Sequence, residues 1–385
     1  MVPYLIVFAA SAAVTLVTTP LVRRLALRVG AVDHPSDRKV HPVPTPTLGG
    51  LAMFLGVLAG LGVARVLPPF ADLHRASSEP VAALVASTAI VAVGVIDDLR
   101  GIPPTAKLAG QVLAAGLMVL VGVQLLWFVL PGQGVLALSP DVAVPLTVLW
   151  TVAMVNAINL IDGLDGLAAG MVAIAATAFF LYMERTPNAF GDESAAALLS
   201  AIAAGAAVGF LPWNFHPARI FMGDAGAMLL GVLLAVATIS GVGRNPYPPT
   251  GGDLAAILIP VSVPLLVLAI PFLDVVLAIV RRVRRGVGIA HADKEHLHHR
   301  LLDIGHSHRR AVLLMYLWSA LISGSGLAVA FIDSRLIVGS ILLVAAGAFG
   351  ATALPRLLPR RALRPGPEGA ARGVEARALP GGRGR

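Results

Sequence analysis

The 385-residue sequence contains no cysteine and few charged side chains. Without cysteine, neither a disulfide framework nor a thiolate metal site is available. Charged residues make up 13% of the chain and hydrophobic residues 57%, whereas soluble domains average about 25% charged residues. This composition excludes an ordinary soluble domain and predicts an integral membrane protein.

Long apolar runs occur along most of the chain. A helix needs roughly 17–25 apolar residues to cross the hydrocarbon core of a bilayer. The first run has no basic segment before it and no convincing cleavage site, so we interpret it as a retained span rather than a signal peptide. We predict about eleven spans, at residues 2–22, 48–67, 80–96, 105–123, 142–160, 167–184, 194–212, 224–241, 254–280, 311–331 and 336–354.

The predicted fold is therefore all-α, a polytopic membrane protein of about eleven transmembrane helices. An odd number of spans places the two termini on opposite sides. With Met1 outside, 24 of the 29 Lys and Arg residues lie on the cytoplasmic side, as the positive-inside rule requires. The net charge of +8 thus reflects topology and anionic lipid rather than binding of nucleic acid.

Two parts are predicted along the chain. Residues 1–355 form the membrane domain, with its polar clusters in cytoplasmic loops. Residues 356–385 form a basic tail rich in Arg, Pro and Gly, a composition typical of disorder on the cytoplasmic side. No matching pair of interrupted spans, the mark of many inverted-repeat transporters, is present in the sequence.

The third span ends in two adjacent acids, Asp97 and Asp98. Adjacent side chains on a helix point about 100° apart, so the two carboxylates cannot grip one atom in the same way. One could hold a divalent ion while the other contacts a substrate or takes a proton. The alternative is a solvated helix end with no special role.

The stretch Asn156–Ala168 places Asn159, Asp162 and Asp165 between two apolar runs. A charged side chain deep in a bilayer costs about 2.5–3.5 kcal/mol on insertion scales. The two acids could therefore lie in a hairpin loop at the membrane surface. Clustering with other acids on the cytoplasmic side favours a functional site instead.

The eighth span opens with Gly223-Asp224-Ala225-Gly226. A helix N terminus presents free backbone N–H groups to a nearby phosphate, and glycine allows close approach of the backbone. Asp224 could alternatively act as the N-cap of this helix.

The loop before the tenth span holds six of the ten histidines within residues 291–308. A zinc site is conceivable, but no H-E-x-x-H pattern is present and the neighbours include Lys294 and Arg300. Such cations suit an anion, such as a diphosphate, better than a metal ion. A solvated basic loop is the remaining alternative.

Taken together, these clusters place acids, amides, histidines and Lys107 on one face of the membrane. Oxygen ligands of this kind favour Mg²⁺ or Mn²⁺. Sites of phosphoryl transfer typically combine a divalent ion, a bound diphosphate and cationic side chains that neutralise its charge. The position at the membrane edge implies that one substrate is a lipid.

Four motifs resemble those of the polyprenyl-phosphate N-acetylhexosamine-1-phosphate transferases (glycosyltransferase family 4). They are Asp97-Asp98, the N-x-x-N-x-x-D-G-L-D-G-L run at Asn156–Leu167, F-M-G-D-x-G at Phe221–Gly226 and the histidine run at His296–Arg300. The resemblance covers about residues 1–355. It implies that a polyprenyl phosphate attacks the β-phosphate of a UDP-N-acetylhexosamine, that UMP leaves, and that Mg²⁺ is the cofactor.

The resemblance also implies roles for single residues. Asp224 would be a metal ligand with Asn159 as its partner, and the acids of the third span would act at the lipid phosphate, one as general base. Asp165 would contact uracil, while Asp162 and Gly163 would belong to the same substrate-binding stretch. The other implied residues are Lys107 near the phosphates, Phe221 stacking on uracil, and His296, His298, His299 and Arg300 closing over the diphosphate or sugar.

Two subgroups compete within the resemblance. Phospho-MurNAc-pentapeptide transferases usually carry three consecutive acids at the first motif and an H-H-H-F type run. Here Leu99 follows the two acids and the loop reads H-L-H-H-R. This is similar to the WecA/TagO type, whose members transfer GlcNAc-1-phosphate from UDP-GlcNAc to start surface polysaccharides, teichoic acids or arabinogalactan linkers.

The location implied is the cell membrane (inner or plasma membrane), crossed several times, with the active site on the cytoplasmic face. Polyprenyl length and homodimer formation are left open by the sequence. The alternative from another class is a proton- or ion-coupled transporter. It predicts acids near the middle of spans, whereas these acids occur only at predicted cytoplasmic span ends.

Overall fold

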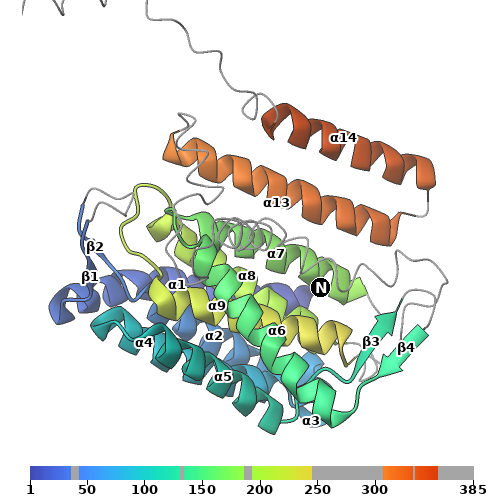
Figure 1. Ribbon diagram of the computed structural model, residues 1–385, viewed down its shortest axis with the longest axis horizontal. Helices are drawn as coiled ribbons and strands as arrows, with labels where there is room; N and C mark the ends of the chain where they lie inside the picture. Colours follow the sequence, from blue (N-terminus) through green and yellow to red (C-terminus); the bar gives the residue numbers. More distant parts are fainter. Residues whose placement is uncertain (36–42, 131–133, 186–192, 245–306, 333, 354–385) are drawn as a thin grey trace, which may run out of the picture. The chain divides into compact units, whose positions relative to one another are not determined.

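The computed structural model describes residues 1–35, 43–130, 134–185, 193–244, 307–332 and 334–353. Long helices account for most of this part of the chain (Figure 1). They are α1 (Val2–Val29), α2 (Gly49–Val66), α4 (Glu79–Arg100), α5 (Pro104–Leu120), α6 (Pro140–Ile161), α7 (Leu167–Arg185), α8 (Ala195–Asn214), α9 (Gly223–Val242), α13 (His308–Phe331) and α14 (Arg335–Ala353).

Short elements connect some of these helices. A 3₁₀ turn (Pro68–Phe70) and α3 (Ala71–Ala76) join α2 to α4. Two antiparallel pairs lie at opposite ends of the bundle (Figure 1). They are β1 (Val32–Asp33) with β2 (Thr45–Pro46), and β3 (Trp127–Leu130) with β4 (Gly134–Ala137).

Ten of the predicted spans coincide with a helix within a few residues at most ends. Eight helices are long and apolar enough to cross a membrane, namely α1, α2, α4, α6, α7, α8, α9 and α13. The apolar parts of α5 and α14 are shorter. The predicted span at 254–280 and the predicted tail from residue 356 lie outside the described residues. A polytopic helical protein is thus confirmed, whereas the count of eleven and the orientation stay predictions.

Glycine and proline determine where several helices begin and end. Gly30 follows α1 with φ 75°, a left-handed conformation that glycine adopts readily. Pro104 and Pro140 begin α5 and α6, where the missing proline N–H would have had no helical partner. These residues separate apolar runs that would otherwise read as longer helices.

The central helix of the bundle is α9. In its most apolar stretch, 89% of the residues are buried, whereas the corresponding fraction in α1 is 28%. It packs on α4, α6 and α8, and Gly94 of α4 lies so close to the backbone of Ala225 that a Cβ there would overlap it. Such close contact between helices relies on small residues at the interface. The same packing brings the N terminus of α9 against the C-terminal end of α4.

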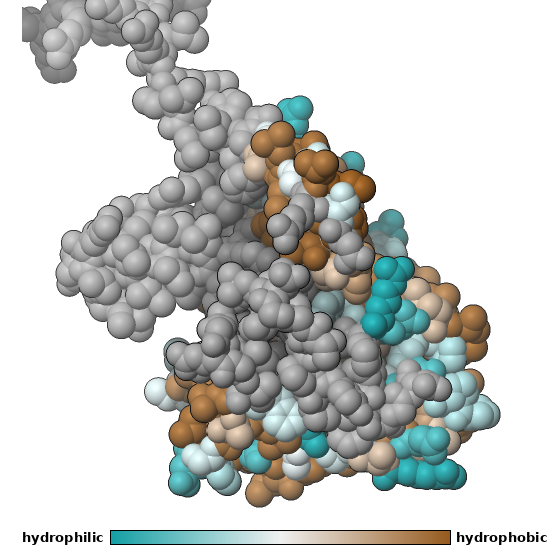
Figure 2. All heavy atoms as spheres, turned by 90° about the vertical axis from the view of Figure 1, so that its right-hand side faces the viewer, coloured by the Kyte–Doolittle hydropathy of each residue, from teal (hydrophilic) through white to brown (hydrophobic). Residues whose placement is uncertain are grey.

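Large apolar side chains also point outward from the bundle. Leu16, Val17 and Leu21 of α1, and Leu113 and Leu120 of α5, are exposed. Figure 2 shows apolar side chains at the surface beside polar ones on the face that contains the β3–β4 end. Lipid tails would solvate these side chains as well as a protein core does.

Two compact units divide the chain, Met1–Ala345 and Ala346–Arg385. Only residues 346–353 of the second unit are described, and they continue α14. All residues of the candidate site belong to the first unit.

Candidate functional site

A cavity of about 580 Å³ opens where several helices begin or end. Ligand sites typically enclose about 300–1,000 Å³. The ends of α4, α6, α9 and α13 meet here, together with the β1 strand and Thr47, the residue that follows β2. Its lining residues are Val32, Asp33, Thr47, Asp97, Asp98, Gly101, Asn159, Asp162, Gly163, Leu164, Asp165, Asn214, Phe221, Gly223, Asp224 and His308.

One group of polar side chains is organised around Lys107. Its ammonium lies 2.7 Å from Asp97 Oδ2 and 2.8 Å from Asp224 Oδ1. The Asn159 amide also donates to Asp224 Oδ1. Four residues predicted from separate motifs thus meet, one from each of α4, α5, α6 and α9. We name Asp97, Lys107, Asn159 and Asp224 the lysine cluster.

Asp98 has a different partner from Asp97, as the angle between adjacent helical side chains predicts. Its carboxylate accepts the backbone N–H groups of Asp224 at 2.8 Å and Ala225 at 3.3 Å. Gly223 has φ 68°, and a Cβ there would overlap Asp98. Asp98 therefore neutralises the positive end of the α9 dipole.

This contact changes two expectations about the start of α9. The helix begins at Gly223, and its N-cap residue is Met222 rather than Asp224. The backbone N–H groups expected to face a phosphate are at least partly occupied, because two of them bond to Asp98. Asp224 instead lies in the first helical turn, with its side chain in the lysine cluster.

Asp162 follows the last residue of α6 and lines the cavity beside Gly163. Burial raises the pKa of its carboxyl to about 8, helped by the negative charges of Asp224, Asp98 and Asp165. Burial is the larger cause, because it disfavours the charged form, and the three nearby carboxylates add to it. Gly163 is exposed, so the backbone is open to a ligand at this point.

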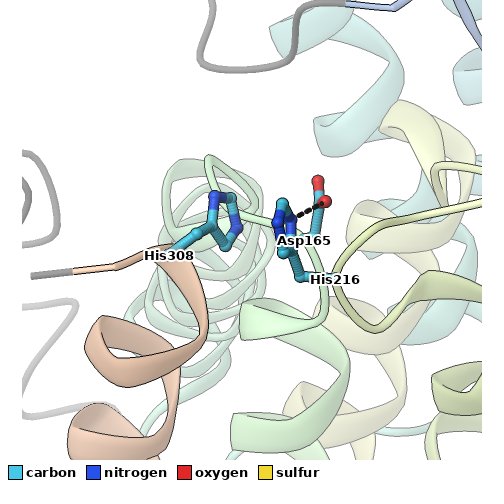
Figure 3. A group of neighbouring side chains, drawn as sticks. All are labelled: Asp165, His216 and His308. Atoms are coloured by element: carbon cyan, nitrogen blue, oxygen red, sulfur yellow. Dashed lines mark hydrogen bonds and ion pairs between the residues drawn. The ribbon is translucent and has the colours of Figure 1, made fainter.

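Asp165 lies in a second group of polar side chains. Its Oδ2 is 2.7 Å from His216 Nδ1 and accepts the backbone N–H of Ala218 at 3.0 Å. The His216 ring stacks on His308, with centroids 4.2 Å apart (Figure 3). We name Asp165, His216 and His308 the histidine cluster.

Phe221 also lines the cavity. Its backbone N–H donates to Pro46 at 2.8 Å, and its carbonyl accepts from Gly49 at 3.0 Å. These bonds tie the segment before α9 to β2 and to the start of α2. The stacking role predicted for the Phe221 ring stays a prediction.

The structure describes nine of the thirteen predicted site residues, and eight of them line this cavity. Lys107 contacts two of the lining residues. The other four, His296, His298, His299 and Arg300, lie outside the described ranges.

Sequence reasoning missed contributions from four residues. Gln111 and Asn156 form an amide pair between α5 and α6, and His216 and His308 join Asp165 in the histidine cluster. Both histidines stand in segments already predicted to be cytoplasmic, which was the available signal. The contact between them could not be predicted, because two complete predicted spans, 224–241 and 254–280, separate His216 from His308 in the sequence.

The donor set around the cavity fits a hard divalent cation. Six carboxylates line it, while His308 is the single basic side chain among the lining residues that the structure describes. Crowded carboxylates repel one another and any diphosphate, and three of them add to the effect of burial in raising the pKa of Asp162. Carboxylate and amide oxygens are ligands that Mg²⁺ or Mn²⁺ prefers. Asp224 and Asn159, the predicted ligands, both line the cavity and could hold such an ion.

Comparison with known proteins identifies the family. Residues 80–242 match the family described as glycosyl transferase family 4, and this range holds the whole lysine cluster. A decaprenyl-phosphate N-acetylglucosaminephosphotransferase of Mycobacterium leprae is 43% identical over 359 residues, covering 91% of this chain and 89% of that protein. The chain belongs to glycosyl transferase family 4.

Two further family relatives show how the likeness is distributed. An undecaprenyl-phosphate alpha-N-acetylglucosaminyl 1-phosphate transferase of Salmonella typhi is 29% identical, covering 80% of this chain and 78% of that protein. A phospho-N-acetylmuramoyl-pentapeptide-transferase of Mycobacterium bovis is 34% identical, but the aligned region covers only 61% of this chain and 76% of that protein. The likeness to the N-acetylglucosamine enzymes therefore extends over more of the chain.

Proposed function

We propose that this protein transfers N-acetylglucosamine-1-phosphate from UDP-N-acetylglucosamine to a membrane polyprenyl phosphate, with release of UMP. The observation that carries the proposal is the lysine cluster, which joins acids, an amide and a cation from four helices around one cavity. Relatives that cover most of the chain are named for this transfer. The reaction would start a lipid-linked envelope polysaccharide.

The transfer exchanges one phosphorus–oxygen bond for another. An oxygen of the lipid phosphate bonds to the β-phosphorus of the donor. The bond from this phosphorus to the oxygen that bridges the two phosphates breaks, and UMP leaves with that oxygen and its electron pair. The products are UMP and the polyprenyl-diphosphate sugar.

Asp97 and Asp98 act at the acceptor end of the site in this proposal. The Lys107 ammonium pairs with both Asp97 and Asp224. Lys107 can therefore attract the acceptor phosphate to the cluster, while the ion pair with Asp97 restricts the movement of the Lys107 side chain. Both oxygens of Asp98 accept backbone N–H groups of α9. This difference favours Asp97 as the proton acceptor and Asp98 as the residue that holds α9 in place.

Asn159 and Asp224 would hold Mg²⁺ or Mn²⁺. A bound ion would offset the negative charge of the diphosphate and of the crowded carboxylates. Gly163 leaves room for the nucleotide beside Asp162, and Asp165 with Phe221 would contact the uracil ring. His296, His298, His299 and Arg300 would close over the diphosphate or sugar. The site would face the cytoplasm from a multi-pass protein of the cell membrane.

A transfer assay tests the proposal directly. Membranes that contain the protein are incubated with UDP-[¹⁴C]GlcNAc, polyprenyl phosphate and Mg²⁺, and butanol-extractable label is counted. We expect label that depends on the lipid and disappears with EDTA. UDP-MurNAc-pentapeptide is assayed in parallel, and preference for that donor would contradict the sugar assignment. Absence of lipid-linked label from either donor would refute the transferase proposal.

A substitution at Asp224 tests its proposed role as a metal ligand. Asp224→Asn removes one negative charge from the lysine cluster while keeping the shape of the side chain. We expect turnover to fall at least about 100-fold with unchanged expression and unfolding temperature. Asp72→Asn is the matched control, because Asp72 is 83% exposed in α3 and pairs with Arg75. Near-normal turnover of Asp224→Asn would refute its assignment as a metal ligand.

A further inference from the structure

The histidine cluster occupies one part of the cavity lining and has no role assigned to two of its members. His216 lies in the segment between α8 and α9, and His308 is the first residue of α13. Figure 3 shows the His216 ring between the Asp165 carboxylate and the His308 ring. The two rings are nearly parallel, with an interplanar angle of 15°.

The cluster does not have the geometry of a metal site. One donor atom from each residue lies within 4.8 Å of the others, so a shared ion deserves consideration. Imidazole lone pairs lie in the plane of the ring, and these two stacked rings lie in separate, nearly parallel planes with centroids 4.2 Å apart, so their lone pairs do not converge on one nearby ion. An ionised carboxylate only accepts, so His216 Nδ1 carries the hydrogen of the 2.7 Å bond and offers no lone pair.

The contacts instead hold the Asp165 carboxylate in one orientation. His216 and the Ala218 backbone both donate to Oδ2. Within the described part of the chain these are the hydrogen bonds that Asp165 makes, and they leave Oδ1 to a ligand. The side chain is 11% exposed and lines the cavity. A carboxylate held this way accepts a hydrogen bond but donates none.

His216 is itself held from a separate element. His308 stacks on its ring, and Arg309 Nε donates to its backbone carbonyl at 3.1 Å. Both contacts come from the first turn of α13, which packs along α7. The position of the Asp165 carboxylate therefore depends on α13 through His216.

An acceptor-only group distinguishes two pyrimidine bases. Uracil carries a hydrogen on N3 and donates there, whereas cytosine N3 accepts. A fixed carboxylate oxygen pairs with the uracil N–H and repels the cytosine lone pair. We propose that His216 is a positioning residue that holds Asp165 so that the site selects uracil nucleotides over cytosine nucleotides. The inference rests on the proposed function, because it takes the donor to be a nucleotide.

Nucleotide binding tests the inference without requiring turnover. The dissociation constants of UMP and CMP are measured by calorimetry on detergent-purified protein with Mg²⁺. We expect the wild-type protein to prefer UMP, and His216→Ala to reduce the ratio of the two constants about tenfold or more. His216→Asn keeps an N–H donor near the position of Nδ1 and should retain most of the preference.

Two further measurements separate positioning from general damage. In the transfer assay, His216→Ala should raise KM for the UDP-sugar about tenfold while kcat changes less than about threefold. His74→Ala is the matched histidine control and should change neither value, since His74 of α3 donates from Nδ1 to the backbone carbonyl of Phe70 in the preceding 3₁₀ turn. N3-methyl-UMP lacks the hydrogen that Asp165 would read, so the wild-type protein should bind it at least about tenfold more weakly than UMP.

Different results would contradict the role of His216 and the proposed transfer reaction. An unchanged UMP-to-CMP ratio in His216→Ala would refute the role of His216. Equal weakening of both nucleotides would mean that Asp165 reads the ribose or only supports the fold, which also refutes it. If His216→Ala does not fold, His216→Asn becomes the test. A folded His216→Asn protein that no longer prefers UMP over CMP would refute the positioning role of His216. A wild-type protein that transfers no sugar phosphate would refute the proposed function alone.

Discussion

At the scale of single residues, the site is built from carboxylates that each have a different environment. Asp97 pairs with Lys107, Asp98 accepts from the α9 backbone, and Asp165 accepts from His216. The Asp162 carboxylate makes no hydrogen bond within the described ranges and faces three other acids. Different neighbours therefore give chemically identical side chains different tasks.

The raised pKa of Asp162 predicts how stability depends on pH without a divalent cation. The folded protein keeps the Asp162 proton up to about pH 8, whereas the unfolded chain loses it near 3.8. The folded state thus binds more protons between these values, so its stability falls as pH rises through this window. Thermal unfolding in detergent with EDTA should give a midpoint several degrees lower at pH 8.5 than at pH 5.

Asp162→Asn provides the comparison for this measurement. The amide cannot ionise, so the variant should lose most of the decrease in midpoint between pH 5 and pH 8.5. Saturating Mg²⁺ should reduce the same decrease in the wild-type protein, since a bound cation favours the ionised carboxylate. A variant with the full wild-type pH dependence would show that other groups cause it.

At the scale of elements, an amide pair holds α5 against α6. Asn156 Nδ2 donates to Gln111 Oε1 at 2.7 Å, and Gln111 is 1% exposed. Gln111 lies one turn from Lys107 on α5, and Asn156 lies nearly one turn from Asn159 on α6. The pair therefore sets the relative position of two helices that supply the lysine cluster.

A double-mutant cycle tests this positioning. Hydrogen bonds between membrane helices contribute about 0.6 kcal/mol on average and up to about 1.7. We expect Gln111→Leu and Asn156→Leu each to lower turnover several-fold, and the double variant to be less impaired than the product of the single effects. Transfer assays and unfolding midpoints of all four proteins supply the measurement.

Thr88→Val is the control for this cycle. Its hydroxyl is exposed on α4 and bonds to the carbonyl of Leu84 in its own helix, so no helix pair depends on it. We expect it to keep normal turnover. Strictly multiplicative effects of the two amide variants would show that Gln111 and Asn156 act independently.

At the scale of the whole molecule, helix ends from distant parts of the chain meet at one cavity. The lining residues come from the segment after α1, from α4, from α6 and from the beginnings of α9 and α13. Consecutive spans alternate in direction, so these ends all belong to the side predicted to be cytoplasmic. The β3–β4 pair lies at the other end of the bundle (Figure 1).

The absence of cysteine makes this orientation testable with single substitutions. Arg75→Cys places a thiol on exposed α3, predicted to lie outside, and Thr105→Cys places one at the exposed start of α5, predicted to be cytoplasmic. A membrane-impermeant maleimide should label the first in intact cells and the second only in inside-out vesicles. The reverse pattern would contradict the predicted topology.

Local features of the sequence were sufficient for the membrane class, most helix positions and the motif residues. Hydropathy and helix length depend on neighbouring residues, so they are readable without coordinates. Spacing also predicted that Asp97 and Asp98 have different partners. It could not name those partners, because the Asp98 contact with α9 joins positions 126 residues apart.

What the sequence determined by itself is therefore a cysteine-free helical membrane protein whose motif acids stand at span ends predicted to lie on one side. Only the tertiary structure decided that Asp98 holds the start of α9, that Gln111 pairs with Asn156, and that His216 stands between Asp165 and His308. The physical reason is that a helix sequence specifies its own periodicity, whereas contacts between helices depend on packing. Close approach at residues such as Gly94 determines which side chains meet.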